Sequence, residues 1–299
     1  MSSKSRLDLY KVFCKVAEQG SISRAAHELY MSQSAVSQAI MQMERELDTR
    51  LFNRTPRGVS LTAEGALIYD YARSALNLIR TGEQRLLEFR NVAAGELKIG
   101  VGDTISKHYL LPYLEQFHIR YPNIRFNIFN GTTLEICALL KSGAADVGIC
   151  NFPLKDSALE QIPCMQVQDV FVCGWKYRTL FRDAECVALQ DLVRHPLIML
   201  ERNSNSRKYV EDYLMSHGIV VSPEFELGSH DLLLEFAKIN LGVACVTRQF
   251  AMEFIEKRLV YEIPVTPVIP ERSIGVCYLK SVSLSPASAK FVELLLAEP

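Results

Sequence analysis

The side chains best suited to molecular recognition are short hydroxyls and amides in the segment 32–54, SQSAVSQAIMQMERELDTRLFNR. Apolar residues in this segment recur three or four positions apart, which places them on one face of a helix. They are Val36, Ile40, Met43 and Leu47. Glutamine can bond bidentately to adenine and serine can bond to several base edges, so the opposite face is suited to reading DNA bases. The residues expected there are Gln33, Ser34, Ser37, Gln38 and Gln42, with Ser32 as the helix N-cap beside them.

A shorter helix precedes this segment. Ser21 is placed to cap it and is expected, with Ser23, to contact DNA, while the small pair Ala25-Ala26 allows two helices to approach closely. Residues 30–32 then form a tight turn, so the sequence predicts a helix-turn-helix whose second helix enters a major groove. Two ordinary surface helices fit the same periodicity. Basic residues that could meet phosphates flank the next turn, Arg54 and Arg57.

The stretch from Gly20 to Gly65 resembles the N-terminal winged helix-turn-helix of LysR-type transcriptional regulators. The total length and the order of the later segments are also similar to this family, so the resemblance extends over nearly the whole chain. The matching residues are Ala25-Ala26, Ser32–Ser37, Glu44, Leu47, Leu51-Phe52, Arg54, Leu61-Thr62 and Gly65.

The resemblance implies an α/β protein with three parts. These are a winged helix-turn-helix DNA-binding domain (1–61), a linker and dimerisation helix (62–91) and an effector-binding domain (96–299) resembling periplasmic binding proteins. Lobe I of that domain would comprise residues 96–163 and 267–299, and lobe II residues 164–266. The implied function is sequence-specific transcriptional regulation at an inverted-repeat operator in double-stranded DNA, modulated by a small effector bound between the lobes. The implied assembly is a homodimer that pairs into a homotetramer, with RNA polymerase as a further partner.

The expected linker helix carries its own pairing signal. Thr62 is placed to cap it, and apolar or small residues recur along it at spacings of three and four. This heptad-like seam favours pairing between two copies of the chain, although an amphipathic helix packed on its own domain gives a similar pattern. The seam residues are Gly65, Ile68, Ala72, Ala75, Ile79, Gly82, Leu86 and Phe89.

From Glu96 the pattern alternates between short strands and helices, which indicates mostly parallel sheets covered by helices. Pro163 marks one break in this pattern, and the prolines at 264, 267 and 270 mark a second. Two breaks predict two crossovers between two lobes. The expected strands are 97–101, 124–130, 146–150, 169–175, 197–200, 224–227, 243–246 and 273–279, and the expected helices are 109–121, 133–142, 209–217, 232–240 and 287–296.

Four loops at expected strand and helix ends are rich in hydroxyl and amide groups, where ligands of α/β sheets bind. Singly, each loop reads equally well as a helix cap. If they converge between two lobes, the hydroxyls, the helix N-termini and Arg207 suit a small anion. The family resemblance places a ligand-contacting threonine at Thr104. The expected effector-binding residues are Thr104, Ser106, Thr132, Thr133, Ser204, Ser206 and His230.

Composition narrows the function class. The net charge is −1, but residues 1–90 hold 13 Lys and Arg against 10 Asp and Glu, so a weakly basic module precedes an acidic body. No apolar run is long enough to span a membrane and no signal peptide is recognisable, which predicts a cytoplasmic protein and argues against an exported solute-binding protein. The sequence contains no motif of a hydrolase, nucleotide-binding enzyme or metalloprotease, and the six histidines lack metal-ligand spacing. We therefore expect no enzyme activity, no cofactor and no metal.

The eight cysteines include no C-x-x-C pair, and most lie in apolar contexts typical of buried thiols. Cys164 and Cys173 are nine positions apart and are the pair considered for a redox switch. The alternative function is therefore a thiol-responsive LysR-type regulator without a small-molecule ligand.

Overall fold

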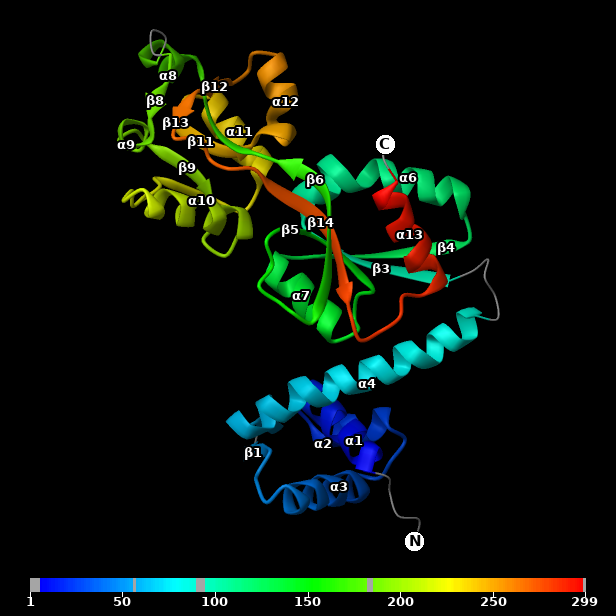
Figure 1. Ribbon diagram of the computed structural model, residues 1–299. Coiled ribbons are helices and arrows are strands. Elements are labelled where there is room, and N and C mark those ends of the chain that lie inside the picture. The colour runs from blue at the N-terminus through cyan, green and yellow to red at the C-terminus, as the bar shows by residue number, and fades with distance from the viewer. Residues whose placement is uncertain (1–5, 56–57, 90–94, 182–184, 298–299) are drawn as a thin grey trace. The chain divides into compact units, whose positions relative to one another are not determined.

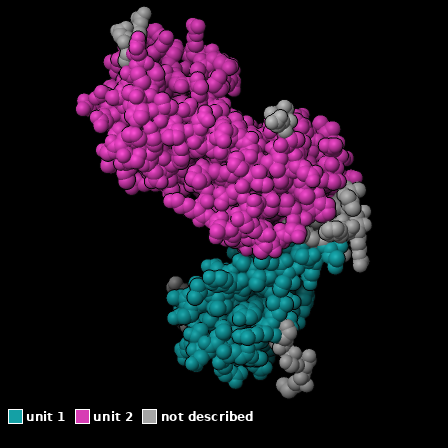
Figure 2. Space-filling view, in the orientation of Figure 1, with its two compact units in different colours: residues 1–87 teal, residues 88–299 magenta. Residues whose placement is uncertain are grey.

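The computed structural model describes residues 6–55, 58–89, 95–181 and 185–297. The chain divides into two compact units, residues 1–87 and residues 88–299, which Figure 2 colours separately. Among the described residues no helix has the length and apolar character needed to cross a membrane.

Unit 1 is a helical core followed by a two-stranded wing and a long helix. Ser21 and Ser32 cap α2 and α3 as expected, because their hydroxyls accept hydrogen bonds from the backbone N–H groups of Arg24 and Ala35. The expected apolar face of α3 is buried in the core of the unit. The elements are α1 (Arg6–Gln19), α2 (Ile22–Glu28), α3 (Gln33–Glu46), β1 (Phe52–Thr55), β2 (Gly58–Leu61) and α4 (Ala63–Phe89), as Figure 1 shows.

The wing is fixed to α3 and α4 by side chains of the matching motif. A carboxylate oxygen of Glu44 accepts from the backbone N–H groups of Leu51 (2.8 Å) and Phe52 (3.3 Å). Thr62 caps α4 as expected by accepting from the N–H of Gly65 (2.9 Å). Residue 65 must be glycine, because a Cβ atom there would collide with the carbonyl oxygen of Leu51.

The expected seam along α4 has two different environments. Ile68 and Ala72 pack in the core of unit 1, so for the first half of the seam the alternative, a helix packed on its own domain, describes the structure. The second half leaves Ile79 43% exposed and Leu86 62% exposed. The neighbouring surface of the first half exposes further apolar side chains, Leu67 and Tyr71.

Lobe I of unit 2 is a five-stranded sheet in the order β4-β3-β5-β14-β6, with helices on both faces. On one face α6 and α13 meet through Phe117 and Phe291, whose ring centroids are 5.2 Å apart. On the other, α7 lies close to the strands because Gly100 and Gly148 face Ile136. The elements are β3 (Gly95–Val101), α5 (Asp103–Ile105), a π-helical turn (Ser106–Leu110), α6 (Leu111–Arg120), β4 (Ile124–Asn130), α7 (Thr133–Lys141), β5 (Val147–Asn151), β6 (Leu159–Val167), β14 (Arg272–Leu279) and α13 (Pro286–Leu296).

Lobe II repeats this architecture with the order β10-β9-β11-β7-β12. One core packs α8, α9 and α10 against the sheet, and a second core packs α11 and α12 against its other face. The elements are β7 (Asp169–Cys173), α8 (Trp175–Leu180), β8 (Val187–Ala188), α9 (Leu189–Leu192), β9 (Leu197–Leu200), α10 (Asn205–Ser216), β10 (Phe225–Leu227), α11 (His230–Lys238), β11 (Val243–Thr247), α12 (Arg248–Glu256), β12 (Tyr261–Ile263) and β13 (Val265–Thr266).

The chain crosses between the lobes twice, but later than the prolines indicated. Pro163 lies inside β6, opposite Gly275 and beside a register shift, and β6 continues in the sheet of lobe I to Val167. An edge strand tolerates a proline, so Pro163 interrupts no sheet. On the return, Ile269 still packs in a core of lobe II and β14 begins at Arg272. Both lobe boundaries therefore lie a few residues later in the chain than expected, after Val167 and before Arg272.

Candidate DNA-reading surface and effector cavity

The N-terminal half of α3 presents the polar surface expected of a recognition helix. Gln33, Ser34 and Gln38 are exposed, and Ser37 is half-buried. The Ser32 and Ser34 hydroxyls lie 3.0 Å apart, so Ser32 both caps the helix and borders this surface. Among the described residues, no side-chain hydrogen bond engages Gln33 or Gln38, so both amides face solvent on this surface.

Other polar residues nearby are already engaged. The Gln42 amide donates to Glu46 at 2.9 Å, and the Arg24 guanidinium donates to the carbonyl oxygen of Gln19 at 2.6 Å. Ser23 is exposed and Ser21 is half-buried in its capping role. Two arginines were expected to contact phosphates. Arg57 and the side chain of Arg54 both lie outside the described part of the structure.

The turn before α3 contributes a residue that periodicity does not reveal. Tyr30 is 97% exposed and has a φ of 52°, a left-handed conformation that is uncommon for a bulky side chain. Met41, farther along the exposed face of α3, is 43% exposed. Both enlarge the apolar part of the surface around the recognition helix.

In unit 2, a cavity of about 270 Å³ lies between the two lobes. The four expected polar loops all contribute to its wall, and so do the following expected residues: Thr104, Thr132, Thr133, Ser204, Ser206 and His230. Ser106 is absent from the lining, because it begins the π-helical turn one residue beyond Ile105. Asp103 and Asn130 line the cavity as members of two of the expected loops. Polar and aromatic lining residues outside the four expected loops are Glu135, Asn151, Glu201, Thr247 and Phe250.

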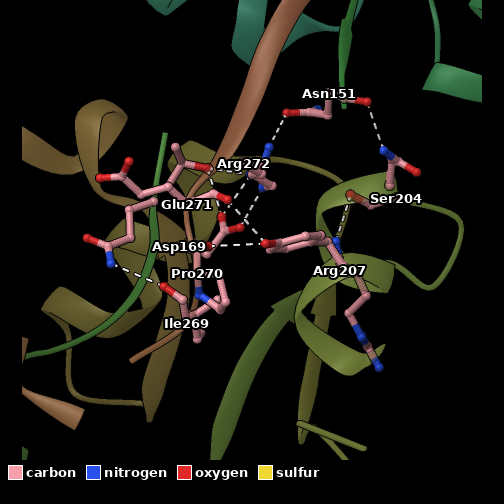
Figure 3. A network of polar contacts seen from close by, with 12 residues as sticks. Asn151, Asp169, Ser204, Arg207, Ile269, Pro270, Glu271 and Arg272 are labelled. Atoms are coloured by element: carbon pink, nitrogen blue, oxygen red, sulfur yellow. Dashed lines mark hydrogen bonds and ion pairs between the residues drawn. The ribbon is translucent and has the colours of Figure 1, made fainter. Parts of the chain in front are cut away.

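Arg207 does not serve the cavity as expected. Its side chain is 1% exposed and pairs with Glu211 at 2.7 Å and Glu226 at 3.4 Å. Its Nη1 also donates to the carbonyl oxygen of Leu200 at 2.6 Å. Figure 3 shows the side chain leading away from Arg272 and Asn151. This cation is neutralised within lobe II, so the expectation that it meets an anion was wrong.

The charges of the cavity wall are acidic. Among the described lining residues there are three carboxylates, of Asp103, Glu135 and Glu201, and no Lys or Arg. Hydrogen bonds from the backbone and hydroxyl of Thr132 hold the pKa of Glu135 below its ordinary value. Asp103 accepts a hydrogen bond from the Asn130 amide. Both lobe I carboxylates are therefore positioned by partners in the same wall.

His230 supplies the only imidazole among the described lining residues. It is 3% exposed, and its Nε2 accepts from the backbone N–H of Thr247 at 2.9 Å. Burial lowers its pKa from 6.5 to about 3, so the ring is neutral. Because Nε2 accepts, the proton lies on Nδ1, and that buried atom has no partner among the described residues.

Beside the cavity, a buried polar network joins the lobes (Figure 3). Arg272 of β14 pairs with Asp169 of β7 at 2.6 Å, and the two side chains are 1% and 4% exposed. Arg272 also donates to the Asn151 side chain at 2.5 Å. The Asn205 side chain, at the start of α10, donates to the backbone carbonyl of Asn151 at 2.9 Å. Asn151 and Asn205 both line the cavity, so the network connects the ligand space to the crossover.

The cysteine pair considered for a redox switch is separated by the fold. Cys164 packs against the core of lobe I, and Cys173 belongs to a core of lobe II. They lie on successive strands, where nine residues of extended chain span about 30 Å, whereas a disulfide needs Cα atoms within about 7 Å. The expectation that these two thiols could pair was wrong.

These features define a class: a winged helix-turn-helix unit joined to a two-lobed α/β domain is the architecture of a transcriptional regulator. Two family models match the chain. "Bacterial regulatory helix-turn-helix protein, lysR family" covers residues 7–66, and "LysR substrate binding domain" covers residues 90–299. The chain belongs to the LysR family. It is a DNA-binding transcriptional regulator and not an enzyme.

Individual relatives agree with this assignment. The HTH-type transcriptional regulator CysL of Bacillus subtilis is 27% identical over 241 residues, covering 81% of this chain and 80% of that protein. CzcR of the same organism is 29% identical over 252 residues, covering 84% and 83%. A full-length OxyR variant of Pseudomonas aeruginosa has a TM-score of 0.68 at 19% identity, covering 98% of this chain and 94% of that chain. CbnR in complex with its target DNA has a TM-score of 0.65 at 22% identity, covering 97% and 99%. Both solved structures are similar to this chain in fold.

Proposed function

We propose that a small effector bound between lobes I and II controls this regulator, and that the effector carries a negative charge. The observation behind the proposal is convergence, because loops after β3 and β4 and before α10 and α11 all line one cavity of about 270 Å³. A space of this size is suited to a small organic molecule. The first turn of α10 contains no acidic residue, so its backbone N–H groups favour an anion.

The effector would act by changing the balance between lobe arrangements. Hydrogen bonds from lobe II to Asn151 and from Arg272 to Asp169 already cross the lobe boundary beside the cavity. A ligand that touches both walls gains affinity only in arrangements where both walls are within reach. Its differential affinity then shifts the population toward those arrangements.

We further propose that the regulator acts as a homodimer paired through α4. The exposed apolar side chains of Ile79 and Leu86 support this pairing, since an isolated helix face of this kind is normally covered. A two-fold dimer places two recognition helices on an inverted repeat in double-stranded DNA. Assembly of dimers into a homotetramer and contact with RNA polymerase remain part of the proposal, as does the cytoplasm as the place where it acts on DNA.

Within each DNA-reading unit we propose a division of roles. Gln33, Ser34, Ser37 and Gln38 would read base edges, because they lie on the polar side of α3. The residues proposed to meet the phosphate backbone or border it are Ser21, Ser23, Ser32, Arg54 and Arg57.

The effector proposal is tested by a ligand screen followed by three variants. A thermal-shift screen of small metabolites on the full chain should find a compound that raises the unfolding temperature and alters the DNase footprint on the operator. Thr104→Ala and Ser206→Ala should shift the concentration needed for that response while leaving operator binding unchanged. Ser106→Ala is the matched control, because Ser106 lies nearby but outside the cavity lining. An unchanged response in both cavity variants would place the site elsewhere.

A further inference from the structure

The two walls of the cavity offer opposite kinds of polar group. The lobe I wall contains the carboxylates of Asp103 and Glu135, with the side chains of Thr104, Thr132 and Thr133 around them. The lobe II wall contains His230, the hydroxyls of Ser204 and Ser206, and the N-termini of α10 and α11. A third carboxylate, Glu201, also lines the cavity from lobe II and is exposed to solvent.

The helix N-termini that face the cavity also differ in whether an acidic side chain occupies them. At the start of α7, Glu135 accepts from the N–H of Thr132 at 2.7 Å in a capping box, so an acidic side chain already occupies this N-terminus. At the start of α10, Ser204 satisfies the N–H of Arg207, and no acidic residue lies in the first turn. The N–H groups of Asn205 and Ser206 have no carbonyl four residues earlier within the helix. The N-terminus of α7 is therefore already occupied by a carboxylate, whereas that of α10 is open to an anion. The other lobe II helix end, at α11, carries Asp231 in its first turn, and this carboxylate pairs with Lys107 (2.8 Å) and His108 (3.4 Å) of lobe I.

His230 supplies an independent observation on the lobe II side, a buried donor that lacks an acceptor. Its Nδ1–H is a buried donor without a partner among the described residues, while its Nε2 is occupied by Thr247. The ring borders the main cavity and also a smaller adjoining one, and both cavities share Ser206 and Thr247 in their walls. A buried donor left unpaired is unfavourable, so an acceptor oxygen reaching it would bind strongly.

We infer that the effector is a small zwitterion, such as an amino acid, whose carboxylate faces lobe II and whose ammonium group faces lobe I. This inference rests on the proposed function of the cavity and specifies its ligand class. The carboxylate would accept from His230 Nδ1–H, from the serine hydroxyls and from the first turn of α10. The ammonium group would donate to Asp103 and Glu135. A ligand with a single anionic group would leave these two carboxylates uncompensated.

The test uses matched ligand series on the purified full chain. The probes are the proteinogenic amino acids together with β-alanine and γ-aminobutyrate, each compared with the carboxylic acid lacking its amine and the amine lacking its carboxylate. Calorimetry should find at least one zwitterion that binds about 10-fold or more tightly than both of its single-charge analogues, since each charged hydrogen bond lost costs a factor of this order.

Variants then assign the ammonium group to lobe I. The double variant Asp103→Asn and Glu135→Gln should weaken that zwitterion about 10- to 100-fold and leave its carboxylic acid analogue unchanged. Glutamine still accepts at the helix start, so the cap of α7 is kept. Glu115→Gln is the matched control, because Glu115 is exposed on α6 away from the cavity.

Several outcomes overturn the inference: no zwitterion of the series binds, a carboxylic acid analogue binds as tightly as its zwitterion, or the double variant binds the zwitterion like the wild type. These outcomes leave the proposed function standing if a compound of another class binds the cavity and alters the footprint. The proposed function itself fails if the responses of Thr104→Ala and Ser206→Ala to every active compound match the wild type.

Discussion

The DNA-reading surface and the effector cavity are assembled from the chain in opposite ways. The proposed base-reading residues lie within one helix turn and its continuation, from Gln33 to Gln38. The cavity takes residues from segments as distant as Gly102 and Phe250. A surface made from one segment is specified by local capping and periodicity, whereas the cavity exists only after two sheets and two crossovers have formed. The comparison predicts that changes at the surface of unit 1 alter DNA binding or the pairing on which it depends, and that changes in unit 2 alter stability or the effector response.

The largest expected effect tests whether α4 joins two copies of unit 1. Ile79→Asp places a charge in the exposed apolar part of the helix, and we expect monomers by light scattering. Operator affinity should fall about 100- to 10,000-fold, because two linked reading units become one. Arg80→Asp, on another face of α4, should stay dimeric. A dimeric Ile79→Asp protein would show that α4 pairs through other residues.

Breaking the buried pair at the crossover should be the next largest effect. Asp169→Asn leaves the Arg272 charge buried without its carboxylate, and breaking such a pair destabilises a protein by about 3–5 kcal/mol. Trp175 is the only tryptophan of the chain and lies in lobe II, so its fluorescence in urea reports this loss. Asp191→Asn, which breaks an exposed pair with Arg194, should cost less than about 1 kcal/mol. Equal losses of unfolding free energy in the two variants would mean that the buried pair stabilises the protein no more than an exposed one.

A smaller effect tests whether Gln33 of α3 contacts DNA bases or is only exposed to solvent. Gln33→Ala should cost about 1–3 kcal/mol of operator binding and leave binding to random DNA unchanged, since a base contact is sequence-specific. Gln42→Ala should have little effect on either, because its amide is bonded to Glu46. Mobility-shift titrations on operator and random duplexes measure both. Similar losses on the two duplexes would assign Gln33 to the phosphate backbone instead.

The effect expected to be smallest near pH 6 is a pH dependence confined to unit 2. Burial depresses the pKa of His230 from 6.5 to about 3. The nearby positive groups of His108, Arg272 and Lys107 lower this pKa further, and the carboxylate of Asp231 opposes them. Below pH 6.5 the unfolded ring takes up a proton that the folded ring refuses, so stability is lost as the pH falls toward about 3.

The His230→Gln variant isolates this contribution. Its stability should fall less steeply than that of the wild type across this range, by up to about 1.4 kcal/mol per pH unit. Urea titrations followed by Trp175 fluorescence at several pH values make the comparison. Parallel curves for the two proteins would mean that His230 is protonated when folded.

The same contrast explains what could be predicted from the sequence. Caps at Ser21, Ser32 and Thr62 act within three residues, and each was found where expected. The strands 124–130 and 197–200 were also found at their expected positions, because their apolar content is bounded by polar loops. Two of the wrong expectations, those at Pro163 and Arg207, show the opposite case. Whether Pro163 ends a strand depends on β14, and whether Arg207 is free depends on Glu211 and Glu226.

The position of β14 has a consequence for the synthesis of the protein. This strand lies between β5 and β6 in the sheet of lobe I, yet it is made after the whole of lobe II. A ribosome adding about 5–20 residues per second needs roughly 6–24 s to pass from β5 to β14, a distance of about 120 residues. During that time β5 and β6 have no neighbour between them, and their unpaired backbone edges invite association with other chains. Lobe II is one uninterrupted stretch and can fold as it emerges. The need for chaperone protection in the nascent chain therefore falls mainly on lobe I.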